Sequence, residues 1–280
     1  MKRTIDPNKP KIKLPIGKSY IQVKKVVKEN NLHTICESGN CPNMHECWGA
    51  GTATFMILGN ICTRSCKFCS VPTGKPLPPD KDEPEKIAQS VKLMRLKHCV
   101  ITSVDRDDLP DGGASFWAET ILKIKELNPN TTIEVLIPDF KGEEKDIQKV
   151  IDAKPDVISH NLETVRRLTK EVRIFAKYDR SLSVLKYIAD NGIRAKSGIM
   201  LGLGETLDEI YSTMDDLLAH NVSIITIGQY LQPTKNNLEV KKFYSEQEFD
   251  EIGKVAKQKG FEFVESGSLV RSSYHAEKHI

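Results

Sequence analysis

The chain has 280 residues, of which 39% are hydrophobic, and its 41 basic and 38 acidic side chains leave a formal net charge of only +3. A charge so close to neutral does not favour a nucleic-acid binder. The longest uninterrupted apolar run, Phe55 to Leu58, is too short to span a bilayer, and the N-terminus lacks the apolar core of a signal peptide. These features predict a globular enzyme of the reducing cytoplasm that does not associate with membranes.

The N-terminal stretch is strongly basic, because residues 1–28 hold nine Lys or Arg residues and a single acid, Asp6. Such a run favours an acidic protein partner through electrostatic steering. The alternative is a solvated tail with no partner. The lysines that we expect to act in steering are Lys9, Lys11, Lys13 and Lys18.

Six of the seven cysteines form two triplets, Cys36-x4-Cys41-x5-Cys47 and Cys62-x3-Cys66-x2-Cys69. Short spacers let one loop place several thiolates around a single inorganic cluster, and three ligands instead of four leave one iron open. On the second triplet, an open iron could chelate S-adenosylmethionine, as happens when radicals are generated from it. The spacing therefore predicts two iron–sulfur clusters.

Zinc and disulfides are the other interpretations of these cysteines. A structural zinc site needs four ligands, and the first triplet could complete one with His33 or His45, whereas no histidine lies near the second. Disulfides are disfavoured because the number of cysteines is odd and a chain of this length can bury a core without them. Cys99 lies in an apolar run and is expected to be an inert core residue.

Strand-like and helical stretches alternate along the rest of the chain. Strands are predicted at 52–58, 98–104, 132–137, 156–161, 193–201 and 223–231. Helices are predicted at 83–97, 114–127, 145–153, 163–171, 181–191, 205–220 and 245–259. Six β/α units in about 210 residues predict an α/β fold, a partial (β/α)6 TIM-like barrel, since the eight-unit form needs about 250.

The expected organisation is one structural unit with three parts. An N-terminal extension (1–51) and a C-terminal extension (261–280) flank the barrel (52–260). In such barrels the chemistry lies in the loops after the strands, and the second triplet follows the first predicted strand. Asp107 and Asp108 follow the second, where they could equally well belong to an ordinary turn.

These motifs together resemble one known family. The C-x3-C-x2-C triplet has the form found in the radical S-adenosylmethionine superfamily, whose fold is often a partial (β/α)6 barrel. The first triplet and the run Arg271-Ser272-Ser273-Tyr274 narrow the resemblance to the lipoyl synthases. It extends from about Cys36 to Ala276, with no departure at a cluster position. Further segments that look like the family are 103–108, 111–113, 160–164, 178–181 and 196–200.

The resemblance implies a sulfurtransferase that inserts two sulfur atoms, at C6 and C8 of a protein-bound octanoyl-lysine. These carbons are unactivated, so a side-chain base cannot remove their hydrogens at neutral pH and a radical is required. The implied cofactors are S-adenosylmethionine and two [4Fe–4S] clusters. The cluster that would cleave S-adenosylmethionine is held by Cys62, Cys66 and Cys69, and the auxiliary cluster that would donate sulfur is held by Cys36, Cys41 and Cys47 in the extensions.

The same resemblance implies further site residues. The family's serine ligand precedes the tyrosine of the C-terminal run, so Ser273 would be the fourth ligand of the donor cluster. A hard alkoxide should hold iron less durably than a thiolate does; the alternative is that this serine only caps the C-terminal tail. The residues expected to line the S-adenosylmethionine pocket are Phe68, Asn161, Glu163 and Arg180.

The implied partners are proteins. They are octanoylated lipoyl-carrier domains of 2-oxoacid dehydrogenase E2 subunits and of the glycine cleavage H protein, a reductant such as flavodoxin or ferredoxin, and an iron–sulfur cluster carrier. No nucleic acid or membrane is expected.

Two other classes of function remain possible from the sequence. A tRNA methylthiotransferase also combines three further cysteines with the radical motif, although this chain lacks room for a separate cluster domain and has no added RNA-binding domain. A non-enzymatic iron–sulfur carrier would ordinarily supply four cysteines to each cluster.

Overall fold

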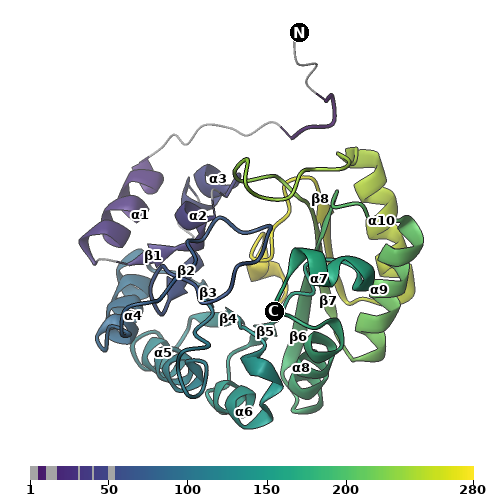
Figure 1. Cartoon of the computed structure of the whole chain (residues 1–280). Helices are drawn as coiled ribbons and strands as arrows, with labels where there is room; N and C mark the ends of the chain where they lie inside the picture. The colour runs from purple at the N-terminus through teal and green to yellow at the C-terminus, as the bar shows by residue number, and fades with distance from the viewer. Residues whose placement is uncertain (1–5, 11–17, 31, 40, 50–53) are drawn as a thin grey trace.

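The computed structural model describes residues 6–10, 18–30, 32–39, 41–49 and 54–280. Its strands form a single sheet in the order β1 to β8, and the longer helices lie outside it (Figure 1). The N-terminal part contributes α1 (Lys18–Glu29), β1 (His33–Thr34), α2 (Ile35–Ser38) and α3 (Met44–Gly49). In these stretches and the rest of the described chain, no helix has both the length and the apolar character needed to cross a membrane.

The strands from β2 to β8 run parallel, each paired with the next. They are β2 (Thr54–Ile57), β3 (His98–Ser103), β4 (Thr132–Leu136), β5 (Val157–Ser159), β6 (Arg194–Leu201), β7 (Ile224–Gln229) and β8 (Phe263–Gly267). The short β1 pairs antiparallel with β2. Within the described residues no ladder joins β8 to β1, so the barrel is partial, as the sequence predicts.

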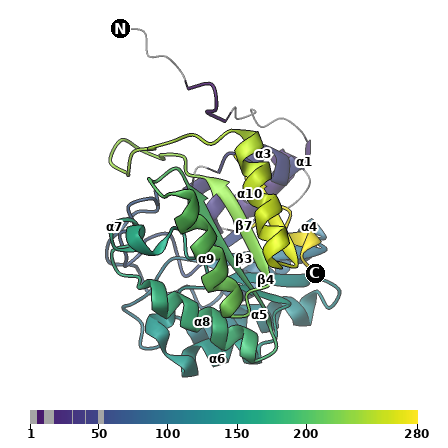
Figure 2. The ribbon, with the colours of Figure 1, turned by 90° about the vertical axis from the view of Figure 1, so that its right-hand side faces the viewer.

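The outer layer consists of α4 (Glu83–Met94), α5 (Ala114–Leu127), α6 (Glu144–Asp152), α8 (Tyr178–Asp190), α9 (Leu207–Ala219) and α10 (Glu246–Lys259), seen from two sides in Figures 1 and 2. Helix α9 begins at a capping box in which Thr206 and Glu209 satisfy each other's main-chain N–H groups. Strand β7 is buried along its whole length, because helices cover one face of the sheet and side chains fill the interior.

Most predicted elements are confirmed within a few residues, and two strands were missed. The interval 163–171 is not one helix: it holds only η2 (Arg166–Leu168) and α7 (Thr169–Val172). Glu163 adopts φ +65° and bridges to Ile199 of β6, so tertiary pairing prevents a helix from starting there. The strands not predicted are β1 and β8, and β8 lies inside the C-terminal extension.

After β8, the chain passes back through the barrel. A Cβ on Gly228 of β7 would collide with the carbonyl of Val270, so the two backbones touch. The segment ends near η3 (Ala276–Lys278), where His279 is 1% exposed. Lys196 Nζ lies 3.2 Å from His279 Nδ1, and Arg194 donates to the His279 carbonyl at 2.6 Å. Figure 2 places this end of the chain on the side away from α7.

The basic N-terminal arm is only partly described. Lys11 and Lys13 lie outside the described residues, as does the side chain of Lys18. Lys9 is exposed, and the neighbouring Asn8 donates a 3.4 Å hydrogen bond to the carbonyl of Phe243.

Candidate active site

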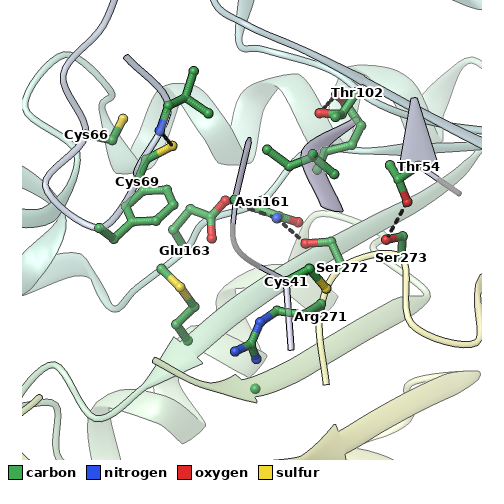
Figure 3. A pocket seen from close by; sticks show the side chains of 18 of the residues that line it. Cys41, Thr54, Cys66, Cys69, Thr102, Asn161, Glu163, Arg271, Ser272 and Ser273 are labelled. Carbon is green, nitrogen blue, oxygen red and sulfur yellow. Dashed lines mark hydrogen bonds between the residues drawn. The ribbon is translucent and has the colours of Figure 1, made fainter. Parts of the chain in front are cut away.

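A cavity of about 540 Å³ occupies the interior of the barrel. Cysteines of both triplets line it: Cys36 and Cys41 from one side, and Cys62, Cys66 and Cys69 from the loop after β2. Cys47 is not among the lining residues. Figure 3 shows Cys66 and Cys69 on one side of the cavity and Cys41 with the C-terminal serines on the other. Positions 230 or more residues apart in the sequence, such as Cys41 and Ser272, therefore line one space.

The loop that carries the second triplet is fixed by its main chain. Cys62 donates its N–H to Pro72 O at 2.8 Å and accepts from Gly74 N at 3.0 Å. The Cys62 sulfur accepts hydrogen bonds from the N–H groups of Arg64, at 3.4 Å, and Asp105, at 3.3 Å. The Cys69 sulfur accepts one from Val71 at 3.4 Å. N–H donors aimed at sulfur stabilise the thiolate that a metal requires.

Arg64, between the ligand cysteines, clamps this loop to two strand ends. Its guanidinium binds Asp107 through two hydrogen bonds of 2.7 and 2.8 Å and Asp139 through one of 2.8 Å. Asp105 lies 3.3 Å away. The Arg64 side chain is 6% exposed and that of Asp139 is fully buried. Asp107 is thus an ion-pair partner, and Asp108 similarly pairs with Arg106 at 2.9 Å, so neither is merely a turn residue.

The first triplet lies beside the C-terminal run. Asn43 donates a 2.6 Å hydrogen bond to Leu269 O, and Tyr274 Oη donates to Glu46 at 3.3 Å. Ser273 Oγ accepts a hydrogen bond of 2.9 Å from Thr54 Oγ1, whereas Ser272 Oγ accepts one of 2.6 Å from Asn161. Ser273 thus lines the same cavity as Cys36 and Cys41, and its role as a cluster ligand stays a prediction from the family resemblance.

The thiols are buried among one another. Burial raises the pKa of Cys36 to about 11, against a main-chain hydrogen bond from Thr54 that lowers it. Burial, followed by the charges of Cys41 and Cys36, raises the pKa of Cys47 to about 12. In the second triplet, burial raises the pKa of Cys66 to about 12. Gathered thiols that resist ionisation alone favour a cationic centre in their midst, because metals bind the thiolate. Both donor sets thus fit iron–sulfur clusters.

A single metal ion finds less support. Among the described side chains, no three from His, Cys, Asp or Glu stand close enough together to hold one ion. The side chain of His45 lies outside the described residues. An iron–sulfur cluster is wider than one ion, so its thiolates need not converge on a point.

Three of the four predicted S-adenosylmethionine contacts line the cavity: Phe68, Asn161 and Glu163. Asn161 donates to the Glu163 carboxylate at 3.0 Å, and burial raises the pKa of Glu163. Arg180 is not among the lining residues. Its guanidinium instead lies 3.4 Å from Asp139 Oδ2, behind the wall.

The sequence reasoning missed Arg64, Arg173 and a buried ion pair. Arg173 lines the cavity and donates a 2.9 Å hydrogen bond to Asn161 O. Lys196 and Glu134, both inaccessible to solvent, are joined by hydrogen bonds of 2.7 and 2.9 Å, and Glu134 lines the cavity. The sequence did contain a signal for Arg64, namely a cation inside a cysteine motif that is followed by acids at strand ends. It contained no such signal for Arg173 or for the Lys196–Glu134 pair.

Apolar side chains from several strands and from the C-terminal segment also line the cavity. They are Met56, Val100, Leu136, Ile199 and Val270. Such a lining suits a hydrocarbon chain better than a polar ligand.

Known proteins resemble this chain in sequence and in fold. The family model described as the Radical SAM superfamily matches residues 56–217. Lipoyl synthase of Flavobacterium johnsoniae is 61% identical over 280 residues, covering 99% of this chain and 97% of that protein. The mitochondrial lipoyl synthase of Nematostella vectensis is 59% identical over 280 residues, covering 98% and 96%. The FeFe-hydrogenase maturase HydG from Carboxydothermus hydrogenoformans shares the fold, with a TM-score of 0.58 at 14% identity over 93% of this chain and 76% of that one.

Proposed function

The chain belongs to the lipoyl synthase family of the radical S-adenosylmethionine superfamily, and from this premise we propose how its residues divide the reaction. It is a sulfurtransferase that inserts two sulfur atoms, at C6 and C8 of a protein-bound octanoyl-lysine. S-adenosylmethionine and a [4Fe–4S] cluster are its cofactors. The observation that carries the proposal is that Cys36 and Cys41 of the first triplet, the whole second triplet and Ser273 line one cavity.

The residue assignment follows the two sides of that cavity. Cys62, Cys66 and Cys69 would hold the cluster that binds S-adenosylmethionine, and Cys36, Cys41, Cys47 and Ser273 would hold a second cluster. When bound, the first supplies the electron that cleaves S-adenosylmethionine to a 5′-deoxyadenosyl radical, and the second supplies sulfur.

The chain's own residues bind and orient the reactants. Arg64 fixes the loop of the second triplet against the strand ends, so its thiols are preorganised. The Glu163 carboxylate offers a partner for the positive charge of S-adenosylmethionine, and Asn161 orients it. The apolar lining holds the octanoyl chain and excludes water, which protects a radical from unwanted hydrogen donors.

The proposed partners are the octanoylated carrier domains of E2 subunits and of the glycine cleavage H protein. A flavodoxin or ferredoxin would supply electrons, and a cluster carrier would rebuild the donor cluster. The exposed Lys9 supports an acidic partner on the N-terminal side. Residence in the cytoplasm stays a prediction from composition.

The deciding experiment is anaerobic incubation of the reconstituted protein with S-adenosylmethionine, a reductant and a peptide that carries octanoyl-lysine. We expect the peptide to gain two sulfur atoms and two molecules of 5′-deoxyadenosine to form per product. A variant with Cys62, Cys66 and Cys69 replaced by alanine is the matched control and should form neither. If 5′-deoxyadenosine accumulates while the peptide mass stays unchanged, the substrate assignment is wrong, as it would be for an enzyme that modifies tRNA.

A further inference from the structure

Thr54 contacts both the C-terminal run and the first triplet. It begins β2 and is 7% exposed. Its hydroxyl donates the 2.9 Å hydrogen bond to Ser273 Oγ, across 219 positions of sequence (Figure 3). Its main chain is hydrogen-bonded to Cys36. A single residue therefore touches both a cysteine of the triplet and the serine.

The neighbouring serine is directed elsewhere. Ser272 accepts its hydrogen bond from Asn161, which in turn binds Glu163, on the side of the cavity that holds Cys66 and Cys69 (Figure 3). The two adjacent hydroxyls thus point at different halves of the site. The Ser273 hydroxyl is hydrogen-bonded to Thr54 at the start of β2.

We propose that Thr54 is a positioning residue for Ser273, whose oxygen it holds toward the donor cluster by a hydrogen bond. The inference rests on the proposed function, in which Ser273 is the fourth ligand. Groups that hydrogen-bond a metal ligand fix its direction, and losing one typically costs about 10–100-fold in metal affinity. Thr54 suits this role because it is branched at Cβ, which restricts its rotamers, and stands on a strand paired with β3.

The rest of the segment has its own anchor, so the role of Thr54 can be tested separately. His279 is held by Lys196 and Arg194 at the far end of the segment. Removing the Thr54 hydroxyl should therefore let the Ser273 hydroxyl rotate while the rest of the C-terminal segment stays in place.

The test compares Thr54→Val, which keeps the shape and loses the hydroxyl, with Thr54→Ser, which keeps the hydroxyl. Thr120→Val is the control, since Thr120 is fully buried on α5 and donates to Phe116 O at 2.8 Å, away from the cavity. Each protein is reconstituted anaerobically and its iron release to a ferrous chelator is followed. We expect the iron of the donor cluster to leave Thr54→Val about 10–100-fold faster than it leaves the wild type. Release from Thr54→Ser and from Thr120→Val should stay near the wild-type rate. In urea unfolding of the cluster-free proteins, the midpoint should shift by a similar amount in Thr54→Val and in Thr120→Val.

A double-mutant cycle with Ser273→Ala separates this inference from the ligand assignment. If Thr54 acts through Ser273, adding Thr54→Val to Ser273→Ala should cause no further loss. Fast release from Ser273→Ala together with wild-type release from Thr54→Val, or additive effects of the two changes, would overturn the positioning role alone. Wild-type release from Ser273→Ala would overturn the ligand assignment and the positioning role together.

Discussion

Replacing Arg64 by methionine should weaken the fold in a way that depends on pH. Burial raises the pKa of Asp139, but the charge and hydrogen bond of Arg64 outweigh it, and the pKa falls to about 2 from an ordinary 3.8. That depression corresponds to about 2 kcal/mol of stability at neutral pH. Losing the cation also leaves the fully buried carboxylate with only Arg180, 3.4 Å away, as an ion-pair partner. Breaking a buried pair costs about 3–5 kcal/mol, and we expect about 3, because Asp105 and Asp107 are partly solvated.

The sign of the pH dependence distinguishes this mechanism from simple loss of packing. In the wild type, the depressed pKa of Asp139 gives stability that is complete above pH 3.8 and is lost as pH falls toward 2. In Arg64→Met, burial is opposed only by the charges of His160 and Arg180, so the pKa of Asp139 rises. We expect the folded state to take up a proton and the deficit to shrink as pH falls from 7 to 5.

The assay is urea unfolding of the cluster-free protein, followed by the fluorescence of Trp48 and Trp117, both fully buried. Arg106→Met is the comparison for loss of a buried guanidinium, because Arg106 is also buried but its partner Asp108 is 37% exposed. A deficit in Arg64→Met that stays constant or grows between pH 7 and pH 5 would refute the reasoning.

Three further predictions concern the clusters and the partner. Anaerobically reconstituted protein should hold about eight irons per chain, and replacing Cys62, Cys66 and Cys69 should leave about four and abolish formation of 5′-deoxyadenosine. Replacing Cys36, Cys41 and Cys47 should stop sulfur insertion while cleavage of S-adenosylmethionine persists. Lipoyl product from this second variant would contradict the proposed division between the clusters. Ser273→Ala and Ser273→Cys should lose most lipoyl product, measured by peptide mass, but keep cleavage, while Ser272→Ala should be milder; full turnover by Ser273→Ala would falsify the ligand role. Reversing the charges of Lys9, Lys11, Lys13 and Lys18 should raise the KM for a carrier protein at low salt and leave a short peptide unaffected; equal kinetics on the carrier would exclude steering.

Most of the parallel strands could be predicted because short runs rich in β-branched residues form them, as in β7, which is buried along its whole length. Strand β8 could not be predicted in this way. Its residues, Phe263 to Gly267, mix apolar and polar types and are all only partly buried. The error at 163–171 lies at the site itself. There Glu163 takes a left-handed backbone and turns its carboxylate toward Asn161, a local departure that sequence periodicity does not register.

Spacing was sufficient to group the cysteines that we propose as cluster ligands, since the members of each triplet lie close together in sequence. It could not reveal Arg173 or the Lys196–Glu134 pair, whose partners are brought together only by the barrel. The serine run was identified by family resemblance alone. Nothing in its own sequence indicates that Ser273 would meet Thr54.

The contact between Thr54 and Ser273 also sets an order of events during synthesis. Its two residues are 219 positions apart, and a ribosome adds about 5–20 residues each second. The first triplet therefore emerges about 10–40 s before the serine that is proposed to complete its site. During that interval the nascent chain presents three thiols without their oxygen partner, and β8 has not yet been made. Iron delivered so early would meet an unfinished binding site, so maturation of the donor cluster should follow release of the chain.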